Sequence, residues 1–309
     1  MLHPTLSTRI PSGSMSDHAP ALFRASLAVL VLASLAPAGG LSSARAQETS
    51  RAAGWPDYTI QAVRYGTIPG FPLRGLIPGA EPDSVDIAMA VWLVRGGGRT
   101  VLFDTGFHRD PWRERYGVTD YLRPDSAVAL AGVAPDSVTD VVVSHAHWDH
   151  MGSLDLFSRA TVWIQRDEYD YYVGRAWQEG GRHGGIDARD VLELVRLNTE
   201  GRVRLVDGDG VEILPGLRVF TGARHTYASQ YLLVEAEPPW VLASDNYYLF
   251  RNVEGMEAGA TFSPDDREAN LAALARMAEL AGSPERVVPG HDLLQFRRFP
   301  GEGRVVRIR

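Results

Sequence analysis

The chain has 309 residues, of which 45% are hydrophobic and 22% charged, a balance typical of a globular protein with a sizeable core. Its formal net charge of −7 argues against a nucleic-acid partner, which would require a basic surface. There is no cysteine and every basic residue is arginine, so the sequence excludes disulfides, thiolate metal ligands and a lysine nucleophile.

Residues 1–46 have the three parts of a secretory signal peptide. Arg24 supplies the positive charge, the apolar run 25–36 follows it, and Ala44-Arg45-Ala46 forms a small-x-small cleavage site. We therefore expect a mature chain that starts at Gln47 and is periplasmic or secreted. Because the apolar run is too short to span a bilayer comfortably, we expect no stable membrane anchor.

Short runs rich in apolar and β-branched residues recur after this leader, and each predicts a strand. In chain order they are 58–65, 87–94, 100–103, 138–143, 161–165, 203–206, 217–220, 231–234, 240–243 and 286–288. Gly96-Gly97-Gly98 predicts a tight hairpin turn between two of them.

Two stretches have the apolar spacing of helices. They are 187–197 and 264–280, the second preceded by Ser263 and ended by Gly282. Strands dominate each half of the chain and helices are appended to them. This order indicates a single α/β domain over residues 47–309, in which two sheets pack together and helices cover the outside.

Metal-binding side chains are concentrated directly after the apolar run Val141-Val142-Val143. His145, His147, Asp149 and His150 lie within six residues, where a buried strand is predicted to leave the sheet. In an extended segment, His145 and His147 point to the same side and can reach one ion. Asp149 and His150 follow where the chain turns into the next helix, so they can reach a second ion.

Three further candidate ligands, His225, Asp245 and His291, each follow a predicted strand. A sheet whose loops deliver such side chains from one edge can form a site for two metal ions. Imidazole and carboxylate ligands suit zinc, with manganese, iron or cobalt as alternatives.

Segment 145–150 resembles the HxHxDH signature of the metallo-β-lactamase superfamily, and the resemblance covers most of the chain after the leader. It implies a four-layer αββα sandwich that binds two divalent ions. The implied ligands are His145, His147 and His225 for the first ion, Asp149, His150 and His291 for the second, and Asp245 as a bridge. Asp104, in a turn that is similar to an early turn of the family, either supports the ligands by hydrogen bonding or simply caps the turn.

Asp245 and Tyr248 resemble the N-acyl homoserine lactonase branch of this superfamily. True β-lactamases usually have cysteine or serine in place of Asp245, and a tyrosine three residues after the bridging aspartate is the lactonase pattern. In that branch the tyrosine hydroxyl faces the substrate carbonyl, whereas an aromatic beside a strand more often packs in a core. The loop 223–230 around His225 lacks the glycines that usually flank this histidine.

The resemblance implies a dinuclear hydrolase of lactones or esters, with N-acyl homoserine lactones as the leading substrate class. A hydroxide that bridges the ions would attack the carbonyl carbon, since two cations lower the pKa of water from about 16 towards about 7. Tyr248 would polarise the carbonyl oxygen, a contribution on the order of 3 kcal/mol in the transition state. Asp149 would help the alkoxide to depart.

Two alternative functions stay open at this point. One is a periplasmic β-lactam hydrolase, which suits an exported chain but not Asp245. The other is a single-iron redox or metal-binding module of the same fold, which would hold one ion rather than two.

Two aromatic features also have two interpretations each. The segment 107–121 either lines an apolar pocket over the metals or is a surface loop anchored by its rings. Trp148 either touches substrate or packs beneath the ligands.

Overall fold

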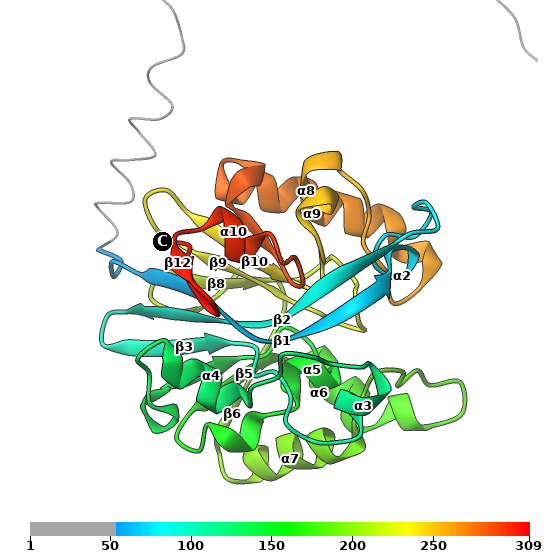
Figure 1. Ribbon diagram of the computed structural model, residues 1–309. Helices are drawn as coiled ribbons and strands as arrows, with labels where there is room; N and C mark the ends of the chain where they lie inside the picture. Colours follow the sequence, from blue (N-terminus) through cyan, green and yellow to red (C-terminus); the bar gives the residue numbers. More distant parts are fainter. Residues whose placement is uncertain (1–53) are drawn as a thin grey trace, which may run out of the picture. The chain divides into compact units, whose positions relative to one another are not determined.

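The computed structural model describes residues 54–309, so the predicted signal peptide and Gln47 lie outside the described residues. None of the helices in this range has the length and hydrophobicity of a membrane span. Two sheets stack face to face, and helices cover the outer face of each (Figure 1). The predicted αββα sandwich is therefore confirmed.

The larger sheet has eight strands in the order β12-β13-β1-β2-β3-β4-β5-β6. They are β1 (Thr59–Pro72), β2 (Ser84–Gly96), β3 (Arg99–Phe103), β4 (Asp140–Val142), β5 (Thr161–Gln165), β6 (Val203–Val206), β12 (Gly301–Glu302) and β13 (Val305–Arg307). Strands β3 to β6 are parallel. Because parallel strands end at the same edge of a sheet, the loops after β3 and β4 leave the sheet side by side.

The smaller sheet has five strands in the order β11-β10-β9-β8-β7. They are β7 (Val211–Leu214), β8 (Leu217–Phe220), β9 (Tyr231–Val234), β10 (Trp240–Ser244) and β11 (Val287–Pro289). Strands β10 and β11 are parallel, so the loops that carry Asp245 and His291 also leave from a common edge.

Helices cover both sheets. On the larger sheet they are α4 (Pro124–Leu130), α5 (Trp148–Met151), α6 (Arg166–Val173) and α7 (Ala188–Thr199), and on the smaller sheet α8 (Phe250–Gly255) and α9 (Arg267–Ala281). Shorter elements are α2 (Leu73–Leu76), α3 (Trp112–Arg115), α10 (Gln295–Arg298) and the 3₁₀ helices η1 (Pro135–Ser137), η2 (Leu154–Leu156), η3 (Arg175–Trp177), η4 (Pro264–Asp266) and η5 (Pro284–Arg286). The predicted helices 187–197 and 264–280 correspond to α7 and to η4 followed by α9.

Strand β2 illustrates why the larger sheet is apolar on both faces. Met89 and Val91 enter the core beneath α4 to α7, whereas Ala90 and Trp92 enter the core between the two sheets. All four side chains are buried. A strand covered on both faces has a nearly continuous apolar sequence instead of an alternating one, which is the pattern of residues 87–94.

The hairpin of β1 and β2 differs from its predicted extent. The sequence predicted that these strands end at residue 65 and begin at residue 87, but they pair as far as Pro72 and Ser84. Register shifts between Arg64 and Gly66 and between Ile68 and Phe71 interrupt the alternation that would mark the extension. The predicted tight turn is confirmed: β2 and β3 pair up to Gly96 and Arg99 around a two-residue turn.

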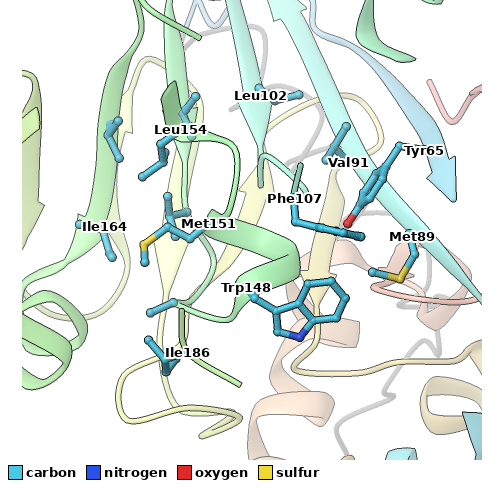
Figure 2. Close-up of a cluster of buried hydrophobic side chains, with 14 of the residues drawn as sticks. Tyr65, Met89, Val91, Leu102, Phe107, Trp148, Met151, Leu154, Ile164 and Ile186 are labelled. Atoms are coloured by element: carbon cyan, nitrogen blue, oxygen red, sulfur yellow. The ribbon is translucent and has the colours of Figure 1, made fainter. Parts of the chain in front are cut away.

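The core beneath the larger sheet reaches directly under the segment with four candidate ligands. Figure 2 shows Trp148 and Met151 of α5 in this core, with Phe107 close to Trp148. Helix α5 has only four residues, so its own hydrogen bonds cannot stabilise it and the packing of these side chains must do so. That packing fixes the direction of the neighbouring side chains of Asp149 and His150.

Candidate metal centre

The seven side chains predicted to be metal ligands meet at the edge where the strands of both sheets end. Their ligand atoms form two groups, His145, His147, His225 and Asp245 in the first and Asp149, His150 and His291 in the second. Within each group the atoms lie within 4.8 Å of one another. All are buried except His147, which is partly exposed. The structure thus brings together every predicted ligand.

Three imidazole nitrogens converge in the first group. Nδ1 of His147 lies 2.9 Å from Nε2 of His145 and 3.0 Å from Nε2 of His225. Nδ1 of His225 lies 3.2 Å from the carbonyl oxygen of Ala260, and Nδ1 of His145 lies 2.8 Å from Oγ of Ser144. We assign the ring proton to Nδ1 in both residues, so that both Nε2 lone pairs point at His147. If Nδ1 of a neutral His147 is protonated, its single proton can satisfy only one of these two lone pairs. A metal ion can instead accept the lone pairs of all three nitrogens.

The second group shows the same orientation of its rings. Nδ1 of His150 lies 2.9 Å from Oδ2 of Asp104, and Nδ1 of His291 lies 2.7 Å from the carbonyl oxygen of Ala88. Each ring therefore donates its Nδ1 proton outward and turns its Nε2 atom inward. Outward hydrogen bonds of this kind fix the tautomer and orientation of metal-binding histidines.

Asp245 faces both groups. Its Oδ1 lies 2.9 Å from Nε2 of His291 and 3.1 Å from Nε2 of His150, and its Oδ2 lies 3.7 Å from Nε2 of His225. Nε2 of His150 and Oδ1 of Asp245 are buried, and neither forms a hydrogen bond with any residue in 54–309. Buried polar atoms without partners are costly, and a shared cation removes that cost.

A histidine of the first ligand group, His147, and a histidine of the second, His150, have pKa values shifted in opposite directions. Burial, with a contribution from neighbouring His225, lowers the pKa of His147 to about 3, so its ring is neutral. Burial acts in the same direction on His150, but the carboxylates of Asp245 and Asp149 outweigh it and raise its pKa well above the ordinary value. Metal binding at such ligands displaces protons. Once such a proton is displaced from His150, imidazoles and ionised carboxylates without sulfur fit divalent ions such as zinc, manganese, iron or cobalt.

Asp104 supports a ligand in each group from a fully buried position. Its Oδ2 accepts hydrogen bonds from Nδ1 of His150 and from the hydroxyls of Ser144 and Ser244, at 2.9, 2.8 and 2.7 Å. Its Oδ1 accepts the backbone N–H of Ser144 at 2.7 Å. Because Ser144 Oγ also contacts Nδ1 of His145, Asp104 contacts His150 directly and His145 through a serine.

Glu168 of α6 is a buried carboxylate that no sequence motif predicts. It accepts hydrogen bonds from the backbone N–H groups of Ala146 and Ala228, at 3.0 and 2.7 Å, and from the hydroxyl of Thr226 at 2.6 Å. It thereby ties the loop of His145 and His147 to the loop of His225. Burial raises the pKa of Glu168 to about 7, although these hydrogen bonds oppose the shift. No local motif marks Glu168, because its partners are 22 to 60 residues away.

Three non-glycine residues of the site have the left-handed backbone conformation, each directly before or within a loop that carries ligands or their supports. They are Asp104, Arg224 and Ser244, with φ of 61°, 57° and 50°. Such residues cost about 1–3 kcal/mol each and persist where surrounding contacts hold them. Arg224 precedes His225 and is held by Asp266, whose Oδ1 lies 3.2 Å from its Nε. The loop that lacks glycines therefore places an arginine where glycine would face no steric cost.

Glycine is required at position 290, between β11 and His291. A Cβ atom there would lie 2.6 Å from Oδ1 of Asp245 and 2.8 Å from the carbonyl of Ser244. Both are fixed parts of the site, so neither can move aside. The absence of a side chain at Gly290 lets the loop of His291 approach the loop of Asp245.

A cavity of about 130 Å³ lies over the ligands, with Tyr248 in its wall. Oη of Tyr248 lies 3.1 Å from Nδ1 of His225, and its ring stacks on His291 with centroids 6.0 Å apart. Burial and the charges of Asp245 and Asp149 raise the pKa of Tyr248 well above its ordinary value. The hydroxyl therefore keeps its proton at neutral pH and can donate a hydrogen bond.

Aromatic residues form another part of the cavity wall. The ring of Trp148 stacks against Trp112 and Tyr116, with centroid distances of 5.1 and 5.0 Å. Tyr116 and Trp148 both line the cavity, so segment 107–121 overhangs the ligands and Trp148 serves as packing and as wall. Ile68 and Phe71 of the extended β1–β2 hairpin add apolar side chains to the cavity lining.

The amino-acid sequence of this chain is similar to a known protein family and to several characterised relatives. The sequence profile of the metallo-beta-lactamase superfamily matches residues 89–291. An N-acyl homoserine lactonase of a Bacillus species is 29% identical over 183 residues, which are 58% of this chain and 66% of that relative. The N-acyl homoserine lactonase AiiB of Agrobacterium fabrum is 25% identical over 237 residues, which are 71% of this chain and 84% of the relative. The chain thus spans slightly less than two thirds of the first of these relatives.

Solved structures with a similar fold include two lactonases. A mutant of B. thuringiensis AiiA with N-decanoyl-L-homoserine bound at the active site has a TM-score of 0.63 and 19% identity, covering 78% of this chain and 96% of that one. AidC, a dizinc quorum-quenching lactonase, has a TM-score of 0.54 and 14% identity, covering 77% and 88%. At these identities the likeness concerns the fold.

Replacing Asp104 with asparagine should weaken metal binding. An asparagine amide would direct N–H groups at donors that now face a carboxylate, so the histidine orientation would loosen. Loss of such outer hydrogen bonds typically lowers metal affinity by about 10–100-fold. Competition titration of zinc against a fluorescent chelator measures the change, with Asp207→Asn in an exposed ion pair as the matched control. Wild-type affinity in Asp104→Asn would contradict this role.

The change Glu168→Gln should separate the two loops that Glu168 joins. One of its three donors would then face an amide N–H, and an unsatisfied buried donor costs about 1–3 kcal/mol. Urea unfolding of the metal-free protein should show that loss, and zinc affinity should fall because His147 and His225 are no longer held together. Glu279→Gln, on the exposed side of α9, is the control. Unchanged stability and unchanged zinc affinity would together show that Glu168 does not hold the loops.

Proposed function

The chain belongs to the metallo-beta-lactamase superfamily, and from this premise we propose that it is a hydrolase that opens lactone or ester bonds with two metal ions. N-acyl homoserine lactones are the leading substrate class, which the lactonase relatives support. The observation that carries the proposal is the position of Asp245, which faces both ligand groups beneath a cavity with Tyr248 in its wall.

Two divalent ions, zinc first, are the cofactors in this proposal. Their ligands would be His145, His147 and His225 for one ion and Asp149, His150 and His291 for the other, with Asp245 shared. Bound ions of this kind act as Lewis acids towards a carbonyl and lower the pKa of water from about 16 towards about 7. The residues around them set the orientation of the substrate and the path of protons.

Tyr248 would donate a hydrogen bond to the carbonyl oxygen of the substrate as negative charge develops there. Its raised pKa keeps the donor protonated, and its contacts with His225 and His291 hold the ring. The ring therefore does not need to reorient during the reaction. A preorganised donor of this type is worth on the order of 3 kcal/mol in the transition state.

Asp149 would move a proton between water and the departing alkoxide. Burial alone would raise its pKa, but His150 and His291 outweigh burial and lower it, so the carboxylate is ionised. Its Oδ2 lies 3.5 and 3.6 Å from Nε2 of these two histidines. With Oδ2 turned to the ligand nitrogens, the other oxygen of the ionised carboxylate can accept a proton from the attacking water and return it to the alkoxide, which is a poor leaving group without one.

Lactone opening should depend on bound metal. Ring opening releases an acid, so a pH-stat follows turnover of a panel of lactones directly. We expect turnover that a chelator abolishes and zinc restores, with two ions per chain by elemental analysis. A metal-loaded protein that opens no lactone would refute the proposal. Hydrolysis of nitrocefin would then favour a β-lactam hydrolase, and one iron with oxygen consumption a redox module.

Removing the hydroxyl of Tyr248 should slow catalysis more than it weakens substrate binding. For Tyr248→Phe we expect kcat to fall by about 10²–10³-fold with little change in KM, because the lost hydrogen bond acts mainly in the transition state. Tyr169→Phe removes a hydroxyl that accepts a hydrogen bond from Asn198, outside the cavity, and should keep wild-type kcat. Equal kcat for both variants would exclude Tyr248 from the chemistry.

A further inference from the structure

A second cavity adjoins the one over the metal ligands. It has a volume of about 260 Å³, and like the first it is lined by His147 and His225. Small-molecule sites usually measure roughly 300–1,000 Å³, so the cavity of about 130 Å³ over the ligands is too small to hold a complete substrate. The part of a substrate that does not react must extend beyond it, and the second cavity offers one path.

Arg182 and Phe262 line the far side of this second cavity. The same two residues line a third cavity of about 370 Å³, so the three spaces follow one another. We call the second and third cavities together the Arg182 groove. It starts at the imidazoles of the metal centre and ends at an exposed cluster of arginines.

Arg182 is held in place although it is exposed. Its backbone N–H donates to Oη of Tyr171 at 2.9 Å, its guanidinium donates to the carbonyl oxygen of Phe262, and it lies 5.2 Å from the centroid of the Phe262 ring. A guanidinium has five N–H donors, and only one is used in this contact. Among residues 54–309, Arg182 forms no ion pair with a carboxylate. The remaining donors can therefore bind an anion.

The outer part of the groove, the third cavity, has an aromatic floor. The rings of Tyr171 and Tyr227 stack with centroids 4.1 Å apart, and Phe262 contacts both edgewise at 5.7 and 5.8 Å. These rings line the third cavity, whereas Tyr172, Ala260 and Phe262 supply the apolar lining of the second cavity, which Arg182 shares with the imidazoles of His147 and His225. A hydrocarbon segment can lie on such a surface while a polar group at its end reaches Arg182.

The charges at the outer end of the groove are mostly positive. Arg224 pairs with Asp266, which leaves Arg175 and Arg182 facing one exposed carboxylate, Asp265. The whole chain has a formal charge of −7, so a cavity lined by one more arginine than aspartates differs from the general charge of the protein. A local positive end on an acidic protein attracts anions to that end.

We propose that the Arg182 groove binds a carboxylate carried by the part of the substrate that does not react. This inference rests on the proposed function, because it places the reacting carbonyl at the metal centre. The preferred substrates are then lactones whose side chain ends in a carboxylate. A carboxylate can accept two parallel hydrogen bonds from the guanidinium of Arg182, and the methylene groups between carbonyl and carboxylate lie along Tyr172, Ala260 and Phe262 of the second cavity.

A matched pair of substrates tests the proposal. N-adipoyl homoserine lactone and its terminal amide have the same size and differ in one charge. For the wild-type protein we expect kcat/KM to be about fivefold higher for the carboxylate, chiefly through KM, and the preference to shrink in about 0.5 M sodium chloride. Succinoyl and suberoyl analogues show which chain length reaches Arg182.

Variants assign the preference to Arg182. Arg182→Gln should bring the ratio of the two kcat/KM values close to one, and Arg182→Lys should retain part of it. Arg159→Gln removes the same charge from an exposed position before β5, at the opposite end of the strands, and should keep the wild-type ratio. A wild-type ratio near one, or an unchanged ratio in Arg182→Gln, would overturn the proposal.

A binding measurement separates this proposal from the proposed function. Isothermal titration compares adipate with its monoamide, adipamate, on the purified protein and on Arg182→Gln. Tighter binding of adipate that is lost in Arg182→Gln supports the groove even if no lactone is hydrolysed, in which case only the proposed function fails. If lactones are hydrolysed but adipate and adipamate bind equally, the groove proposal fails and the proposed function stands.

Discussion

The metal centre depends on where each histidine places its single ring proton. A neutral imidazole can turn a lone pair inward only if its proton is bound on the outer side, and the protein supplies an acceptor there. Asp104 accepts from His150, the carbonyl of Ala88 accepts from His291, and the carbonyl of Ala260 accepts from His225. These acceptors belong to separate strands and loops, so the convergence of the lone pairs is a property of the whole fold.

The fold provides this arrangement at the cost of local backbone strain. The left-handed conformations of Asp104 and Ser244 lie directly beside the ligands, and both side chains belong to one buried network. The hydrogen bond between Ser244 and Asp104 crosses from one sheet to the other, so a shift of either sheet would break it. The hydrogen bonds that offset this strain therefore hold the two sheets in one relative position at the site.

The part of the site that could be predicted from the sequence is the part encoded locally. A ligand that follows an apolar strand, such as His145 after β4 or Asp245 after β10, is recognisable because strand and ligand are adjacent in the chain. Glu168 and the second half of the β1–β2 hairpin were missed for a physical reason. Glu168 acts through partners distant in sequence, and the hairpin extension contains bulges that break the alternation of a strand.

The residues that would carry out the reaction and the residues that would select the substrate lie in different parts of the fold. The ligands are placed by strand ends that two buried cores hold rigidly, so they tolerate little change. The groove beyond them is formed by Tyr171 and Arg182 around α6 and η3, and by Phe262 before η4, which contribute no predicted ligand. Substitutions there can alter which side chain of a substrate is accepted without moving an imidazole. Because loops on a rigid scaffold vary at low cost to stability, substrate preference in this fold can change faster than the reaction itself.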